Sequence, residues 1–339
     1  MKLHLHSSVL QLRHSFAISR GSYQNLNNLV VGLQQDQHTG WGEATQNAYY
    51  PHSNIELLKS TLERLQDRIQ ALPIDHPEKA WTALAPELSA TPFAQCALDV
   101  ACWDLFAKSK NIPLYQYWQR PLDHLPISSY TLSIADIPTL IERLKANPWP
   151  IYKIKLGTDQ DLEIVEALRA HTDAIFRVDA NCGWTLEETL EKAPKLKALG
   201  VEFIEQPLPT DQWEAMEELY ARSPLPLFAD ESCQTLEDIT RCKGRFHGIT
   251  IKLMKCGGIT PALRMITKAE QLGLKKMMGC MVSSSIGISA IAQLLPMLDY
   301  VDMDGALLLA HDIAEGARVT AEGVQWGKRN GTGAHLLEV

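Results

Sequence analysis

Short apolar runs alternate with helix-like polar stretches along the central and C-terminal parts of the chain. Each run has the length of a buried strand, and the stretches between them, such as LEETLEKAPKLKALG, show helical periodicity and end on stop signals such as Gly200. Strands that alternate with helices are typical of βα units, whose parallel strands are joined by right-handed crossovers. The eight strands predicted in this way are 127–132, 150–155, 174–179, 201–205, 226–230, 248–253, 275–280 and 300–304.

The N-terminal part of the chain has a different pattern, in which segments of alternating apolar and polar residues precede the helix-like stretches. Residues 1–13, 27–34 and 38–45 alternate between apolar and polar positions, which predicts an antiparallel meander. The segment FAISRGSYQNLN between the first two strands is rich in small polar residues and is predicted to be a loop, with Arg20 as its only strong cation. Arginines on loops commonly face solvent, so the alternative interpretation is that Arg20 is a solvated surface residue.

Three helices are predicted after the meander. Ser53 is the expected N-cap of a helix that runs through Ala71, a second helix spans 76–84, and Pro92 opens a third that runs through Lys108. Three strands followed by helices predict an α+β unit that is distinct from the βα units after it.

The length of the chain agrees with two domains, because 339 residues exceed the usual size of one. We predict an α+β domain over residues 1–112 and a larger domain over 126–315, with the tail 316–339 packing back on the first. Apolar residues make up 45% of the chain and charged residues 21%, as in ordinary globular proteins. The net charge of −8 argues against nucleic acid or an anionic membrane surface as a partner.

The cysteines and the N-terminus predict a cytoplasmic protein. The seven cysteines are an odd number without a CxxC pair, which is typical of reduced thiols. The first residues, MKLHLHSSVLQLRH, lack the apolar region of a signal peptide, and no apolar stretch approaches the length of a membrane span.

Five ionisable residues end successive predicted strands at nearly even intervals. Lys155, Asp179, Glu205, Asp230 and Lys252 are separated by 24, 26, 25 and 22 residues. If the sheet closes into a barrel, these residues ring its C-terminal mouth, where such barrels carry their chemistry. Three carboxylates without a cation would repel one another, so a divalent metal is their natural occupant. Ligands that are all oxygen suit Mg²⁺ or Mn²⁺ rather than zinc.

A second lysine belongs to the same cluster. Lys153 and Lys155 are two residues apart on a strand, so both side chains point to the same side, here the interior. Burying two ammonium groups is costly unless anions compensate, and the three carboxylates supply that compensation. An inert buried ion network is the competing interpretation. Function is favoured, because perturbed charges cluster at functional sites more than in scaffolds.

Five motifs carry a family resemblance as a set. KIK at 153–155, DAN at 179–181, EQP at 205–207, DES at 230–232 and IKLMKCGG at 251–258 resemble the muconate-lactonizing-enzyme-like subgroup of the enolase superfamily. Each motif alone is weak, since a KxK is usually an exposed strand face and DES could cap a helix. The resemblance implies the α/β class, with a (β/α)7β TIM-type barrel under an N-terminal α+β capping domain. It also implies one Mg²⁺ per subunit bound by Asp179, Glu205 and Asp230, with Lys155 and Lys252, not Lys255, as the bases.

Two lysines on opposite sides of a metal suit proton transfer beside a carboxylate. The metal would bind the substrate carboxylate and stabilise the enediolate that forms when the α-proton leaves. One lysine, neutral because burial and nearby cations lower its pKa, would remove the proton, and the other would donate one to the opposite face. This pairing is a known pattern of enolase-superfamily sites.

The eighth predicted strand ends in an aspartate pair, Asp302 and Asp304. A DxD before a glycine is often turn chemistry, but here it would join three carboxylates already at the mouth, so the substrate should bring a cation. The pair resembles that of the dipeptide epimerases in this superfamily, where it holds the α-ammonium of the substrate. The same resemblance implies that Arg20 pairs with a glutamate side chain, as in the L-Ala-D/L-Glu type. Thr131, Lys153 and Cys280 are expected to line the substrate pocket.

Other interpretations remain open at this point. An o-succinylbenzoate synthase or muconate cycloisomerase would share the metal and the lysines, but its anionic substrate would not suit Asp302 and Asp304. An N-acylamino-acid racemase has no free ammonium to offer them. A catalytically retired enolase-fold scaffold should have lost one of the five central residues, and all five are present. The expected partner is a dipeptide, and the sequence leaves a homo-oligomer open.

Overall fold

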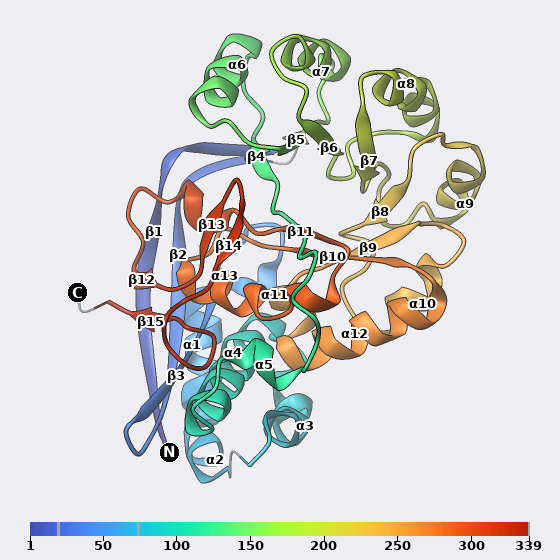
Figure 1. Ribbon diagram of the computed structural model, residues 1–339. Helices are drawn as coiled ribbons and strands as arrows, with labels where there is room; N and C mark the ends of the chain where they lie inside the picture. Colours follow the sequence, from blue (N-terminus) through green and yellow to red (C-terminus); the bar gives the residue numbers. More distant parts are fainter. Residues whose placement is uncertain (19–20, 73–74, 338–339) are drawn as a thin grey trace.

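The computed structural model describes residues 1–18, 21–72 and 75–337 of the chain (Figure 1). The N-terminal part is an antiparallel sheet in the order β1-β2-β3, followed by helices. Its elements are β1 (Lys2–Ile18), β2 (Gly21–Gln35), β3 (His38–Thr45), the 3₁₀ turn η1 (Pro51–Ser53), α1 (Ile55–Arg64), α2 (Gln66–Ala71), α3 (Pro77–Leu88), α4 (Pro92–Ser109) and α5 (Leu114–Tyr117).

Two local predictions in this part were wrong. The predicted loop from Phe16 onwards is mostly strand, because β1 and β2 continue pairing as far as Ile18 and Gly21. The polar composition of this segment led to the wrong prediction. The end of the hairpin is stabilised by backbone pairing and by ring contacts, not by alternating apolar and polar residues. The first helix is capped by Asn54, whose side chain accepts from the Leu57 N–H, whereas the Ser53 hydroxyl donates to a loop carbonyl. Arg20 lies outside the described residues.

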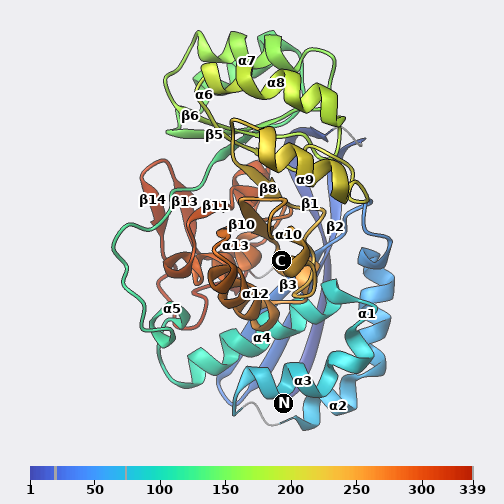
Figure 2. The same ribbon diagram turned by 90° about the vertical axis from the view of Figure 1, so that its right-hand side faces the viewer.

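Helix α4 lies between the three-stranded sheet and the barrel (Figure 2). Nearly all of its residues are buried, because it has neighbours on both sides. The sheet approaches it closely through glycines of β3. A Cβ on Gly40 would lie 2.1 Å from the Ala101 carbonyl oxygen, and one on Gly42 would lie 2.0 Å from that of Ala97. Only residues without a side chain allow this contact.

The second part is an eight-stranded parallel sheet in the order β11-β10-β9-β8-β7-β6-β5-β4. A parallel bridge between Ser128 and Val301 links its two edges, so the barrel is nearly closed. The strands are β4 (Tyr130–Leu132), β5 (Ile151–Lys155), β6 (Ile175–Asp179), β7 (Val201–Glu205), β8 (Leu227–Ala229), β9 (Gly248–Ile251), β10 (Lys275–Gly279) and β11 (Tyr300–Asp302). All eight predicted strands are present, and the predicted α/β barrel is confirmed.

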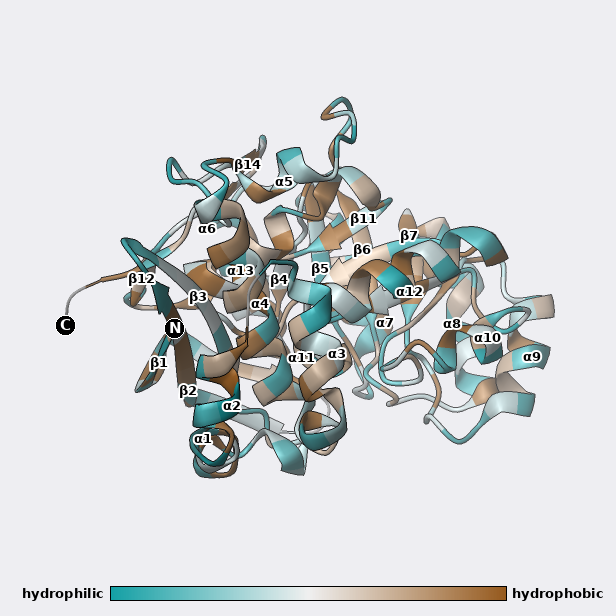
Figure 3. Ribbon diagram, turned by 90° about the horizontal axis from the view of Figure 1, so that it is seen from below, coloured by the Kyte–Doolittle hydropathy of each residue, from teal (hydrophilic) through white to brown (hydrophobic). Residues whose placement is uncertain are grey.

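Helices cover the outside of this sheet. They are α6 (Ile137–Ala146), α7 (Asp161–Arg169), α8 (Leu186–Ala198), α9 (Trp213–Arg222), α10 (Asp238–Cys242), α11 (Leu253–Cys256), α12 (Ile259–Leu272) and α13 (Ser285–Ala292). In Figure 3, α8 to α10 carry both teal and brown bands, as expected for helices with one face on the sheet and one in water. Among the described residues, no helix is long and apolar enough to cross a membrane.

The C-terminal tail returns to helix α4. The turn η2 (Leu295–Met297) precedes β11, and η3 (Gly305–Leu308) and β12 (Ala314–Glu315) follow it. The tail itself contains β13 (Arg318–Thr320), β14 (Gly323–Gln325) and β15 (His335–Leu336). The N–H and hydroxyl of Thr332 donate to Asp104 of α4 at 2.7 and 3.1 Å. The N–H of Leu114 donates to the carbonyl of Gly331 at 2.7 Å. These bonds join the tail to the first part of the chain, and the domain boundaries given above stay a prediction.

Candidate active site

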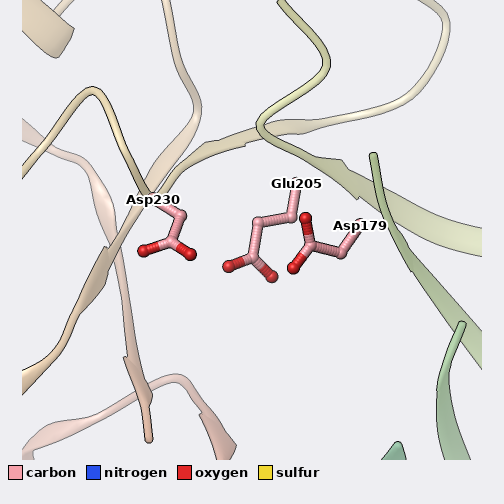
Figure 4. Close-up of side chains that lie close together, drawn as sticks. All are labelled: Asp179, Glu205 and Asp230. Carbon is pink, nitrogen blue, oxygen red and sulfur yellow. The ribbon is translucent and has the colours of Figure 1, made fainter. Parts of the chain in front are cut away.

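Three carboxylates meet at the carboxyl ends of neighbouring strands. Asp179 ends β6, Glu205 ends β7 and Asp230 follows β8, and β6 and β7 pair Asp179 directly with Glu205. One oxygen from each residue lies within 4.8 Å of the others, and each residue is at most 1% exposed (Figure 4). Glu205 Oε1 accepts no hydrogen bond from any described residue, and Oε2 has an ion-pair neighbour, the Nζ of Lys153 at 2.8 Å, without hydrogen-bond geometry. Buried oxygens in this state fit a hard divalent cation, because such ions take oxygen ligands.

Four lysines surround these carboxylates. The Nζ of Lys153 lies 2.8 Å from Glu205 and 3.2 Å from Asp179, and the Nζ of Lys155 donates to Asp179 at 2.6 Å. On the other side, Lys252 Nζ donates to Asp230 Oδ2 at 2.8 Å and Lys255 Nζ donates to Asp230 Oδ1 at 2.6 Å. The buried charges therefore compensate one another, as the sequence predicted.

Lys252 and Lys255 differ in what they face. Lys252 lines the same pocket as Lys155, whereas the side chain of Lys255 has no exposed surface and also donates to the carbonyls of Asp230 and Cys233. Lys255 thus holds Asp230 from the interior. Because β5 and β9 are four strands apart in an eight-stranded barrel, Lys155 and Lys252 approach the pocket from opposite sides.

The electrostatic setting moves the pKa values of these groups far apart. Burial alone would raise the pKa of Asp179, but Lys155 and Lys153 lower it to about 2. Burial raises the pKa of Glu205 to about 7, because its lysine neighbours do not fully offset the loss of hydration and the repulsion from Asp179. Burial opposes the charge of Lys252, but Asp230 raises the pKa of this lysine above its ordinary value. Perturbed pKa values of this kind cluster at functional sites.

The two aspartates at the end of the barrel have unequal partners. Asp302 ends β11 and accepts from Lys153 at 2.7 Å and from the Ser129 hydroxyl at 2.8 Å. Asp304 accepts only from Thr131, through the N–H at 2.6 Å and the hydroxyl at 3.1 Å, and no lysine or arginine of the described residues bridges it. Burial and the neighbouring Asp302 raise the pKa of Asp304 to about 7. The sequence predicted that the substrate brings a cation to this pair, and that stays a prediction; the structure adds that Asp302 already has Lys153 as a partner.

One pocket joins most of the predicted residues. Its lining includes Thr131, Lys153, Lys155, Asp230, Lys252, Cys280, Asp302 and Asp304. Sequence reasoning missed the wall made by Phe16 and Tyr23, whose rings are stacked with centroids 5.6 Å apart, and by Ile18 beside them. It missed them because the segment was assigned to a polar loop. Asn181 and Glu231 also line the pocket, and both lie inside motifs that the sequence had already singled out.

Comparison with known proteins decides the family. Residues 2–117 match the mandelate racemase / muconate lactonizing enzyme N-terminal domain, and residues 137–338 match the enolase C-terminal domain-like family. The chain belongs to this family of the enolase superfamily. The predicted resemblance is therefore confirmed.

Relatives within the family have closely similar chains. An L-Ala-D/L-amino acid epimerase of Flavobacterium johnsoniae is 48% identical over 99% of this chain and 100% of its own. A protein of the same name from a Maribacter species is 50% identical over 95% of both chains. The crystal structure of a dipeptide epimerase from Enterococcus faecalis, complexed with Mg and L-Leu-L-Tyr, is 27% identical, with a TM-score of 0.92 over 98% of each chain.

Proposed function

We propose that this protein is a metal-dependent dipeptide epimerase, which inverts the α-carbon of the second residue of a dipeptide. The observation that carries the proposal is the placement of Lys155 and Lys252 on opposite sides of one pocket, next to three buried carboxylates. The names of the relatives agree with this reaction. An epimerase needs one acid–base group on each face of the carbon, and this arrangement provides both.

Asp179, Glu205 and Asp230 would hold the metal ion. We propose Mg²⁺, with Mn²⁺ as the other ion that suits this ligand set. When bound, the ion would neutralise negative charge on the substrate carboxylate and remove the anionic environment that now favours the charged form of Lys252.

The two lysines would exchange protons with opposite faces of the α-carbon. A neutral lysine takes the α-proton and becomes an ammonium, while the lysine on the other face gives up a proton and becomes neutral. The reverse reaction starts from that second state, so each lysine serves one stereoisomer. Lys153 has a different task, because it lies between Asp302, Glu205 and Asp179 and compensates their charges.

The α-ammonium of the first residue would bind at the end of β11. Asp304 is the natural acceptor, since Asp302 already has Lys153 as its partner. This preference separates a dipeptide from an N-acylated amino acid, a muconate or a succinylbenzoate precursor, none of which carries an ammonium. Thr131 and Cys280 would line the same end of the pocket.

The chemical class of the side chain on the second residue of the dipeptide is a separate part of the proposal. The proposal of an L-Ala-D/L-Glu substrate depends on Arg20, which lies outside the described residues. The wall formed by Phe16, Ile18 and Tyr23 supports apolar second residues as well. A cytoplasmic location and a homo-oligomer are proposed from the sequence alone.

The test is α-deuterium uptake from a dipeptide library in D₂O, followed by mass spectrometry and by chiral analysis of the products. We expect uptake of one deuterium at the second residue with inversion, and none after removal of divalent ions by a chelator. Libraries of N-acetylated dipeptides are the matched control, because they lack only the ammonium. Uptake that is equal for both libraries would contradict the proposal, and so would activity that survives the chelator.

A further inference from the structure

The segment that carries Lys252 forms a compact unit of backbone hydrogen bonds. The N–H of Lys255 donates to the carbonyl of Lys252 at 2.9 Å. The N–H groups of Gly257 and Gly258 both donate to the carbonyl of Leu253, at 3.0 and 2.9 Å. Helix α12 starts directly afterwards at Ile259. Because these hydrogen bonds hold the segment together, a displacement at the start of α12 also displaces Lys252.

The start of α12 is held by a side chain from the other domain. Asp99 of α4 accepts from the N–H of Thr260 at 2.8 Å and from its hydroxyl at 2.7 Å. Trp103 of the same helix donates to the Thr260 hydroxyl at 2.9 Å. Asp99 is 3% exposed and sits at the positive end of the α12 dipole, where a carboxylate is favoured.

Close packing leaves the two glycines before α12 little room to move. Gly258 has φ of +122°, and a Cβ there would lie 2.4 Å from Asp99 Oδ2. Gly257 has φ of +96°, and a Cβ there would lie 2.9 Å from Gln95 of α4. The indole N–H of Trp81 also donates to the Gly257 carbonyl at 3.3 Å. The N-terminal α+β domain thus contacts this turn through Gln95, Asp99 and Trp81, and the hydrogen bonds to Asp99 are the shortest.

We infer that Asp99 is a positioning residue for Lys252, so that the capping domain sets the geometry of proton transfer on one face of the substrate only. The inference rests on the proposed function, because it assigns Lys252 to one face. Lys155 lies on β5, four strands from β9, and Asp99 accepts no hydrogen bond from the described residues of that segment. Loss of Asp99 should therefore affect the two faces unequally.

Helix α4 itself provides a matched control. Asp104 also accepts from the N–H and hydroxyl of a threonine, Thr332, at 2.7 and 3.1 Å, both through Oδ1. Its Oδ2 accepts from the Trp41 N–H at 2.8 Å and from Lys108 at 2.6 Å, so this aspartate has more partners than Asp99. Thr332 belongs to the C-terminal tail and does not line the pocket. Asp99→Asn and Asp104→Asn each weaken a buried aspartate–threonine contact of this helix. Only the Asp99–Thr260 contact lies next to the segment that carries Lys252.

The experiment measures α-deuterium uptake separately for each epimer of one dipeptide in D₂O. Lys252→Ala first shows which epimer depends on Lys252, as the one whose uptake it abolishes. Asp99→Asn should reduce uptake of that epimer by roughly tenfold relative to the other, because displacements within 1 Å cost up to about a hundredfold in rate. Asp104→Asn should leave the ratio between the epimers at its wild-type value.

Each outcome decides a separate claim. An Asp99→Asn protein that loses uptake of both epimers equally, or of neither, overturns the positioning role. If Asp99→Asn does not fold by circular dichroism, Thr260→Val gives the same reading, since it removes the hydroxyl that Asp99 accepts from. A wild-type protein that exchanges neither epimer contradicts the proposed function instead.

Discussion

Glu43 should make the stability of this protein fall as the pH rises. This residue of β3 is 2% exposed and accepts from the Ser284 hydroxyl at 2.7 Å, the Gly287 N–H at 2.9 Å and the Asn28 amide at 3.2 Å. It therefore caps helix α13 from the other domain. Burial raises the pKa of Glu43 to about 7, against the stabilising effect of these hydrogen bonds.

The sign and the size of the effect on stability follow from the raised pKa of Glu43. The carboxyl ionises at its ordinary pKa of 4.5 in the unfolded chain and at about 7 in the folded one, so the folded state binds more protons between these values. Stability is then lost as the pH rises through this window. At about 1.4 kcal/mol for each pKa unit, the free energy of unfolding should fall by about 2–3 kcal/mol between pH 5 and pH 8.

Glu43→Gln isolates this contribution, because the amide keeps the shape and cannot ionise. Urea unfolding of both proteins at pH 5 and pH 8, with a chelator present, gives the free energies. The difference between variant and wild type should shift by about 2–3 kcal/mol in favour of the variant at pH 8. Taking this difference cancels other buried acids such as Asp99, whose pKa burial also raises to about 7. Parallel pH profiles for the two proteins would refute the reasoning.

Three further changes test the site itself. Glu205→Gln should abolish turnover and Mg²⁺ binding by calorimetry while circular dichroism stays unchanged, and retained Mg²⁺ binding would contradict its role as a ligand. Lys255→Met should weaken Mg²⁺ binding through the loss of support for Asp230, and its remaining activity should still exchange both epimers, whereas Lys252→Ala should lose the exchange of one. Asp304→Asn should lower kcat/KM by roughly tenfold to a hundredfold for every dipeptide, the value of a charged hydrogen bond, and a loss confined to certain side chains would refute it.

Regular features of the fold were predictable because they repeat locally. Each barrel strand is a short apolar run, and the side-chain period of two places Lys153 and Lys155 on one face without knowledge of the rest. The convergence of Asp179, Glu205 and Asp230 followed from the topology of parallel strands alone. These predictions needed only the order of the elements.

Features that depend on contacts distant in sequence were not predictable. Phe16 and Tyr23 form a pocket wall because backbone pairing extends the hairpin, although their segment has the composition of a loop. Asp99 bonds a residue 161 positions away, and nothing near it in the sequence distinguishes it from Asp104 on the same helix. The role of such residues is set by which helix they meet after folding.

The aspartate pair shows how such a contact changes the chemistry. Asp302 and Asp304 are two residues apart, which in a strand would give them similar surroundings, but β11 ends at Asp302 and Asp304 precedes the turn η3. Asp302 thereby meets Lys153, 149 residues away, while the hydrogen bonds that Asp304 accepts from the described residues come from the N–H and hydroxyl of Thr131. A substrate ammonium at Asp302 would have to compete with a buried lysine. At Asp304 it would supply a cation that no ion pair of the described residues provides, so specificity for a free amino terminus should depend chiefly on this one carboxylate.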